Sequence, residues 1–208
     1  PRMLISFMRR SAWMMPTGAC RMRRNSARLA GSWRNAVSIL KRSCHSARVA
    51  LYTDLIAETI GLAPERRRWL KRGALLHDVG KLGVSNSVLD KPGKLDADEW
   101  AAVQAHAAYT EAILSRIDAF SELARVSAAH HERLDGKGYP RGLMAEQISL
   151  ETRIITTADI FDAITAERPY RGAVPIPKTL EIMAENVGTA IDPQCFEALK
   201  QALARLPS

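Results

Sequence analysis

The sequence predicts an all-α protein, a multi-helix bundle in which polar side chains from several helices converge on one site. Apolar residues recur every three or four positions through most of residues 45–206, which is the period of an amphipathic helix, and no segment has the alternation of a strand. Histidines and carboxylates lie within or beside these helical patterns rather than in a tag-like run. A bundle therefore explains both the apolar period and the spacing of the polar residues.

Composition indicates one globular domain with a distinct leader. Of the 208 residues, 47% are hydrophobic and 25% are charged, and no apolar run approaches the roughly 18 residues of a transmembrane helix. The three cysteines are scattered and form no CxxC pair, which argues against a zinc–thiolate site or a disulfide framework and favours a reducing, cytoplasmic location. We assign residues 1–30 to a basic leader or linker and residues 31–208 to the domain.

The positive net charge is concentrated near the beginning of the chain. Eleven basic residues and no acidic residue precede Tyr52, and Asp54 is the first acid. The other 19 basic groups and all 22 acidic groups follow, so that part has a net charge of −3. The leader fits a solvated segment, an arm for nucleic acid or an anionic membrane surface, or a transit peptide, and the sequence leaves these alternatives open.

The expected elements follow from apolar stripes and from start and stop signals. Gly61 ends a helix that begins near His45, and Pro64 begins a second helix that continues to Asp78, where Gly80 and Gly83 end it. Residues 84–95 and 134–142 are expected to be loops because they are rich in Gly, Pro or Asn. Further helices are expected at about 32–40, 97–114, 120–132, 151–167, 177–187 and 192–206.

The adjacent residues His77 and Asp78 follow an apolar run and precede Gly80 and Lys81. Consecutive helical side chains point about 100° apart, so two of them can converge on one centre at a helix edge. Imidazole and carboxylate together suit a divalent metal, and Lys81, three residues after Asp78, could hold a phosphate oxygen beside it. A lone His-Asp pair is also common as a hydrogen-bonded surface pair, so the other histidines decide the interpretation.

Candidate ligands recur, one or two per helix, on five successive predicted helices. Helix bundles build di-metal sites from inward-facing ligands in this way. Asp159 lies in a mostly apolar helix and needs a partner, either a metal or an arginine. Seven ligands that include one bridging carboxylate would fill two octahedral metals and leave room for water and a phosphate. The candidates are His45, His77, Asp78, His106, His130, His131 and Asp159.

These residues carry a family resemblance. The His77-Asp78 pair, together with the stretch His130-His131-Glu132-Arg133-Leu134-Asp135-Gly136-Lys137-Gly138-Tyr139-Pro140, resembles the HD-GYP domain, a branch of the HD metal-dependent phosphohydrolases. The resemblance extends over about 150 residues, from near His45 to Pro193. It implies a bundle of the HD phosphohydrolase type with a di-metal site between its helices.

The resemblance implies a bacterial phosphodiesterase that hydrolyses cyclic di-GMP to linear pGpG, with further hydrolysis to GMP left open. One metal would be held by His45, His77, Asp78 and Asp159, and the second by the shared Asp78 with His106, His130 and His131. Iron or manganese is the expected metal. Asp78 and Lys81 would be catalytic, with Lys81 on the scissile phosphate and water attacking in line between the two metals. The residues expected to contact or support the nucleotide are Lys81, Arg168, Arg171, Asp162 and Tyr139.

One departure affects the expected number of metals. Lys41 stands where some members of the family have a glutamate that holds a third metal, so we expect two metal ions. The resemblance also raises an upstream sensory or receiver domain, a GGDEF-type signalling partner and a homodimer, without deciding among them.

The alternatives are a phosphohydrolase for another cyclic dinucleotide or for a nucleotide, and a non-catalytic module that binds cyclic dinucleotides. The intact loop around Tyr139 argues against a simple nucleotidase, and the complete ligand set argues against a module without activity.

Overall fold

The computed structural model describes residues 44–167 and 172–206, and within them helices form all regular secondary structure apart from two isolated β-bridges. The predicted all-α fold class is therefore confirmed. The predicted leader, the helix expected at 32–40, Lys41, Arg168 and Arg171 lie outside the described residues. In chain order the elements are α3 (His45–Ile60), α4 (Pro64–Leu76), η1 (Val79–Gly83), α5 (Asn86–Leu89), α6 (Ala97–Leu114), η2 (Asp118–Phe120), α7 (Ser121–Ala128), η3 (Ala145–Gln147), α8 (Leu150–Thr165), α9 (Ile176–Ala184) and α10 (Pro193–Ala204).

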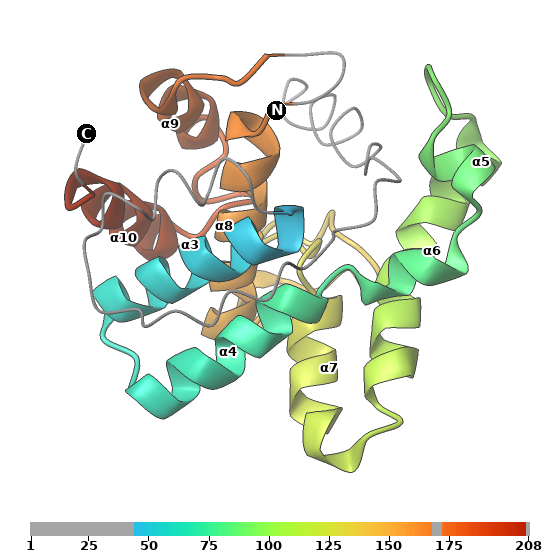
Figure 1. The fold of residues 1–208 in the computed structure, drawn as a ribbon, viewed down its shortest axis with the longest axis horizontal. Helices are drawn as coiled ribbons and strands as arrows, with labels where there is room; N and C mark the ends of the chain where they lie inside the picture. Colours follow the sequence, from blue (N-terminus) through green and yellow to red (C-terminus); the bar gives the residue numbers. More distant parts are fainter. Residues whose placement is uncertain (1–43, 168–171, 207–208) are drawn as a thin grey trace, which may run out of the picture.

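Helix α8 lies at the centre of the bundle. It begins where the Ser149 hydroxyl accepts the backbone N–H of Thr152. Its apolar side chains, among them Ile154, Phe161 and Ile164, are buried on nearly every side of the helix. A helix that is apolar all round has to be covered all round, and α3, α7, α9 and α10 pack against it (Figure 1). Asp159 and Asp162 therefore project from the centre of the bundle.

Helices α3 and α4 form an antiparallel pair, seen in blue and blue-green in Figure 1. Gly61 ends α3 in the left-handed conformation, with φ 92°, and its N–H donates to the carbonyls of Ala57 and Glu58. This conformation strongly favours glycine, and Pro64 at the start of α4 has a φ already suited to a first helical turn. Both signals were predicted from the sequence, and the bounds of α3 agree with the prediction.

The segment after α4 differs from the prediction of a helix through Asp78. The α-helix ends at Leu76, and Asp78, with φ −102° and ψ 8°, precedes the 3₁₀ helix η1. The Lys81 N–H donates to the Asp78 carbonyl at 3.0 Å, which closes the tighter turn. This change of helix type redirects the chain toward α6, against which η1 packs.

Helices α6 and α7 lie side by side in Figure 1 and pack against each other. The predicted loop over 84–95 is wrong at residues 86–89, because the Ser85 side chain caps the single-turn helix α5. The helix predicted to reach Glu132 ends at Ala128, because the chain folds back and Tyr139 N–H donates to the His131 carbonyl at 3.2 Å. None of the described helices has the length and apolar character needed to cross a membrane.

The start of α6 is stabilised by a reciprocal capping interaction that can be tested by substitution. Asp96 accepts the Glu99 N–H at 2.9 Å, and Glu99 accepts the Asp96 N–H at 2.9 Å. We expect Asp96→Ala to lower the free energy of unfolding by about 1 kcal/mol, measured by urea denaturation, because a capping hydrogen bond is lost. Asp98→Ala removes an equal charge from the same turn without removing a cap. An equal loss in both variants would contradict the capping account.

Candidate metal centre

Three histidines are held in the same tautomer by their own helices. A carbonyl oxygen can only accept a hydrogen bond, so each Nδ1 that faces a carbonyl must carry the proton, and each Nε2 keeps a lone pair. This leaves Nε2 as the metal-binding atom, oriented by the bond at Nδ1. The Nδ1–carbonyl distances are 2.7 Å for His77 to Ala74, 2.5 Å for His106 to Val103 and 2.7 Å for His130 to Ser127.

The Nε2 atoms of these histidines are buried and have no hydrogen-bond partner among the described residues, and the same is true of Asp78 Oδ1. A buried acceptor without a partner is unfavourable by about 1–3 kcal/mol. Four such acceptors in one small region therefore require a cation or a donor that the described residues do not supply. A divalent metal fits this set of imidazole and carboxylate ligands.

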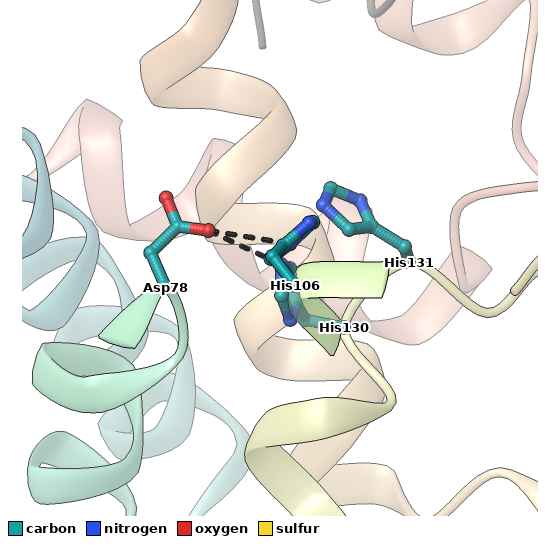
Figure 2. Close-up of side chains that lie close together, drawn as sticks. All are labelled: Asp78, His106, His130 and His131. Carbon is teal, nitrogen blue, oxygen red and sulfur yellow. Dashed lines mark ion pairs between the residues drawn. The ribbon is translucent and has the colours of Figure 1, made fainter. Parts of the chain in front are cut away.

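The two oxygens of Asp78 face two different sets of histidines. Oδ2 lies 3.7 Å from His45 Nε2 and 3.4 Å from His77 Nε2. Oδ1 lies 3.5 Å from His106 Nε2 and 3.8 Å from His130 Nε2. Figure 2 shows Oδ1 directed toward His106 and His130, with His131 beside them. Asp78 thus stands between two potential metal positions.

We name the two sets by the helix that bounds each. The α6-side cluster consists of Asp78, His106, His130 and His131, whose ligand atoms all lie within 4.8 Å of one another. The α3-side cluster consists of His45, His77 and Asp78, which meet the same limit, together with Asp159. Asp159 Oδ1 lies 3.2 Å from His45 Nε2 and 3.8 Å from His77 Nε2. All seven predicted ligand residues are therefore brought together, and each cluster could hold an ion.

Asp162 orients His45 rather than facing open space. Its carboxylate is almost fully buried and contacts His45 Nδ1 at 2.7 Å. It also accepts two bonds from the Arg48 guanidinium, at 2.6 and 2.9 Å. With both oxygens occupied, Asp162 is placed to hold the His45 ring in position. The nucleotide contact predicted for Asp162 stays a prediction, and the position of its carboxylate does not favour it.

Protonation differs between the two clusters. Burial lowers the pKa of His45, but bonds to Asp159 and Asp162 outweigh burial and raise the pKa to about 9. On the α6 side, burial lowers the pKa of His106 and His131, and it lowers the pKa of His130 to about 3. The α6-side imidazoles are thus neutral and ready to bind metal near pH 7, whereas a metal at His45 must displace a proton.

The two carboxylates of the clusters remain ionised. Burial raises the pKa of Asp78, but the adjacent Lys81 ammonium outweighs burial and holds the pKa well below its ordinary value. The pKa of Asp159 is likewise lowered, because bonding to His45 outweighs burial. Lys81 Nζ donates to Asp78 Oδ2 at 2.6 Å, so the ammonium neutralises the carboxylate that faces both clusters.

The loop after His131 folds over the α6-side cluster. The Tyr139 ring lies 4.7 Å from the His131 ring, centroid to centroid, and burial raises the pKa of its phenol well above its ordinary value. A Cβ at Gly138 would lie 2.6 Å from the His131 carbonyl oxygen and 2.4 Å from the Arg133 nitrogen, so only glycine fits this approach. The buried Glu132 carboxylate accepts the N–H groups of Arg141 and Leu143, at 2.7 and 2.9 Å, and holds the loop closed.

Four residues that support the site were not predicted from the sequence. Arg48 and Glu132 hold Asp162 and the loop, as described above. Thr110 Oγ1 donates to the His77 carbonyl at 3.0 Å, and Thr156 Oγ1 donates to the His130 carbonyl at 2.8 Å. Only two of these residues are indicated by the sequence, through their proximity to predicted ligands. Arg48 lies one turn after His45, and Glu132 follows the histidine pair directly.

Comparison with known proteins places the chain in a family. The sequence model of a family described as "HD domain" matches residues 34–195. The chain belongs to the HD domain family. The resemblance to HD-GYP domains is confirmed as well, because the family match covers most of the chain and a relative that is 67% identical is a phosphodiesterase for a cyclic dinucleotide.

Two curated relatives and one solved structure define the neighbourhood of this HD domain. The "3'3'-cGAMP-specific phosphodiesterase 3" of Vibrio cholerae is 67% identical over 163 residues, which are 78% of this chain and 35% of the relative. The "cyclic di-GMP phosphodiesterase response regulator RpfG" of Xanthomonas campestris is 40% identical over 81% of this chain and 44% of its own length. The structure of Bd1817 from Bdellovibrio bacteriovorus shares the fold, with a TM-score of 0.61 and 21% identity over 77% of this chain and 51% of its own. The chain thus spans about a third to about a half of the length of these proteins.

The protonation difference between the clusters can be measured in metal-depleted protein. We expect ¹⁵N NMR of the histidine rings to show His45 as imidazolium from pH 6.5 to near 9, because its pKa is raised, and His130 as neutral imidazole with the proton on Nδ1 throughout pH 5–9. Asp162→Asn should lower the pKa of His45, because a negative partner is removed. Asp98→Asn serves as the control. A His45 that titrates near 6.5 in the native protein would contradict the assigned contacts.

Proposed function

We propose that this HD domain hydrolyses a phosphodiester bond of a cyclic dinucleotide with two divalent metal ions. The observation that carries the proposal is the placement of Asp78, whose two oxygens face two sets of histidine Nε2 atoms. One ion would be held by His45, His77, Asp78 and Asp159, and the other by Asp78, His106, His130 and His131. The mixture of imidazole and carboxylate ligands favours iron or manganese over a soft metal.

Two ions in this arrangement would lower the pKa of a bound water and neutralise charge on the phosphoryl oxygens. Asp78 would hold both positions at a fixed separation. Lys81, whose ammonium lies on Asp78 Oδ2, would turn to the phosphate when a metal takes its place at that oxygen. In-line attack by water on phosphorus forms one P–O bond and breaks the bond to a ribose oxygen, which takes up a proton. The product is the linear dinucleotide.

The relatives favour 3'3'-cGAMP as the substrate. A relative specific for this molecule is 67% identical, whereas the cyclic di-GMP phosphodiesterase from Xanthomonas is 40% identical. Both molecules are cyclic dinucleotides with two phosphodiester bonds. The proposed metal ligands act on the phosphodiester, so they do not discriminate between the two substrates. Cyclic di-GMP, the substrate that the sequence predicted, is therefore the second candidate. Tyr139, Arg168 and Arg171 remain predicted contacts of the nucleotide.

Hydrolysis of both molecules tests the proposal. Manganese- or iron-loaded protein, prepared without oxygen, should convert 3'3'-cGAMP to a linear dinucleotide faster than cyclic di-GMP, and chelator should stop the reaction. Asp78→Asn should lower kcat by about 10³-fold or more, because the shared carboxylate is removed. The exposed Asp90→Asn is the matched control and should keep full activity. Full metal loading with neither substrate turned over would instead favour a binding module.

Lys81 can be tested separately from metal binding. We expect Lys81→Met, which keeps an unbranched side chain only one atom shorter, to lower kcat/KM by about 10²-fold, because a cation at the phosphate is lost. The metal content, measured by elemental analysis, should not fall, since Lys81 is not a ligand. Lys91→Met, which removes an ammonium paired with Glu99, provides the control. A Lys81→Met variant with native kcat/KM would exclude the assigned role.

A further inference from the structure

Thr110 joins the turn that carries Asp78 to the helix that carries His106. It is fully buried on α6, one turn after His106. Its Oγ1 donates to the His77 carbonyl at 3.0 Å and accepts the Gly80 N–H at 3.0 Å. A single hydroxyl thus bonds the backbone on both sides of Asp78.

The turn and the helix are in direct backbone contact at the same point. A Cβ on Gly80 would lie 1.9 Å from the His106 carbonyl oxygen and 2.5 Å from the Thr110 nitrogen. Both atoms belong to the backbone, so no side chain could move aside. The position of η1 on α6 is therefore defined by van der Waals contact at Gly80 and by two hydrogen bonds at Thr110.

This junction determines the distance between two ligands of the α6-side cluster. Asp78 lies between the two backbone groups that Thr110 bonds, and His106 lies on the turn of α6 that Gly80 touches. The separation of 3.5 Å between Asp78 Oδ1 and His106 Nε2 consequently depends on the junction. The α3-side cluster depends on the junction less. Its members His77 and Asp78 both lie on the same side of the junction, and the residues they face, His45 and Asp159, come from α3 and α8 rather than from α6.

We infer that Thr110 is a positioning residue that holds Asp78 and His106 at the separation required by an ion in the α6-side cluster. The inference rests on the proposed two-metal site. Thr110 does not touch the ion or the substrate, and it acts through the backbone of His77 and Gly80. Loss of such a supporting hydrogen bond typically weakens metal binding 10- to 100-fold.

Substitutions at Thr110 separate the hydroxyl from the shape of the side chain. Thr110→Val keeps the shape and leaves a buried carbonyl and a buried N–H without partners. Thr110→Ser keeps the hydroxyl. Thr53→Val is the matched control, because Thr53 is also fully buried and its Oγ1 has no hydrogen-bond partner among the described residues.

The test is a titration of metal-depleted protein with Mn²⁺, in which binding is measured by calorimetry and the free ion is measured by EPR. We expect wild type, Thr110→Ser and Thr53→Val to bind two ions. Thr110→Val should bind one ion with native affinity and the other 10- to 100-fold more weakly. If Thr110→Val does not fold, Thr110→Ala compared with Thr110→Ser, which differ only in the hydroxyl, should show the same selective loss.

The outcomes distinguish this inference from the function on which it rests. Fewer than two ions on the wild type would overturn the proposed metal centre itself. Two ions on the wild type, with both bound at native affinity by Thr110→Val, would overturn the role of Thr110 and leave the proposed function standing. An equal weakening of both ions, together with a lower melting temperature, would show that Thr110 only stabilises the fold and would also overturn its positioning role.

Discussion

The buried, unpaired Nε2 atoms around Asp78 impose the main constraint on this structure. Imidazole and carboxylate groups that are removed from water without partners are unfavourable, and they stay together only because the surrounding helices hold them. Each of His77, His106 and His130 donates a hydrogen bond from Nδ1 to the carbonyl three residues earlier, so the same local bond is made within α6 and just after the ends of α4 and α7. The three Nε2 lone pairs are thereby directed at Asp78 before any ion binds.

The positions of the helix ends follow from this constraint. His77 lies just after α4, His130 lies just after α7 and His45 is the first residue of α3, so each chain segment leaves or enters its helix at the site. Side-chain hydroxyls then fix the segments to one another. Thr110 bonds the carbonyl of His77, and Thr156, on α8, bonds the carbonyl of His130. The buried centre thus depends on backbone positions that neutral hydrogen bonds define.

The sequence predicted what local chemistry determines. Gly61 and Pro64 marked helix ends that the structure places where they were expected, because helix ends depend on neighbouring residues. The change to a 3₁₀ helix after Leu76 was not predicted, since it depends on the contact of Gly80 with α6. The pairing of Arg48 with Asp162 was missed for the same reason, because the two residues are 114 positions apart. The seven candidate ligands lie together as expected, whereas metal binding by them is a proposal.

Asp78 is proposed to bind an ion with each of its two oxygens, and anomalous diffraction from crystals of the manganese-loaded protein tests this arrangement. Two manganese peaks, one on each side of Asp78, are predicted, with His45, His77 and Asp159 around one peak and His106, His130 and His131 around the other. A single peak, or two peaks that do not share Asp78, would contradict the account.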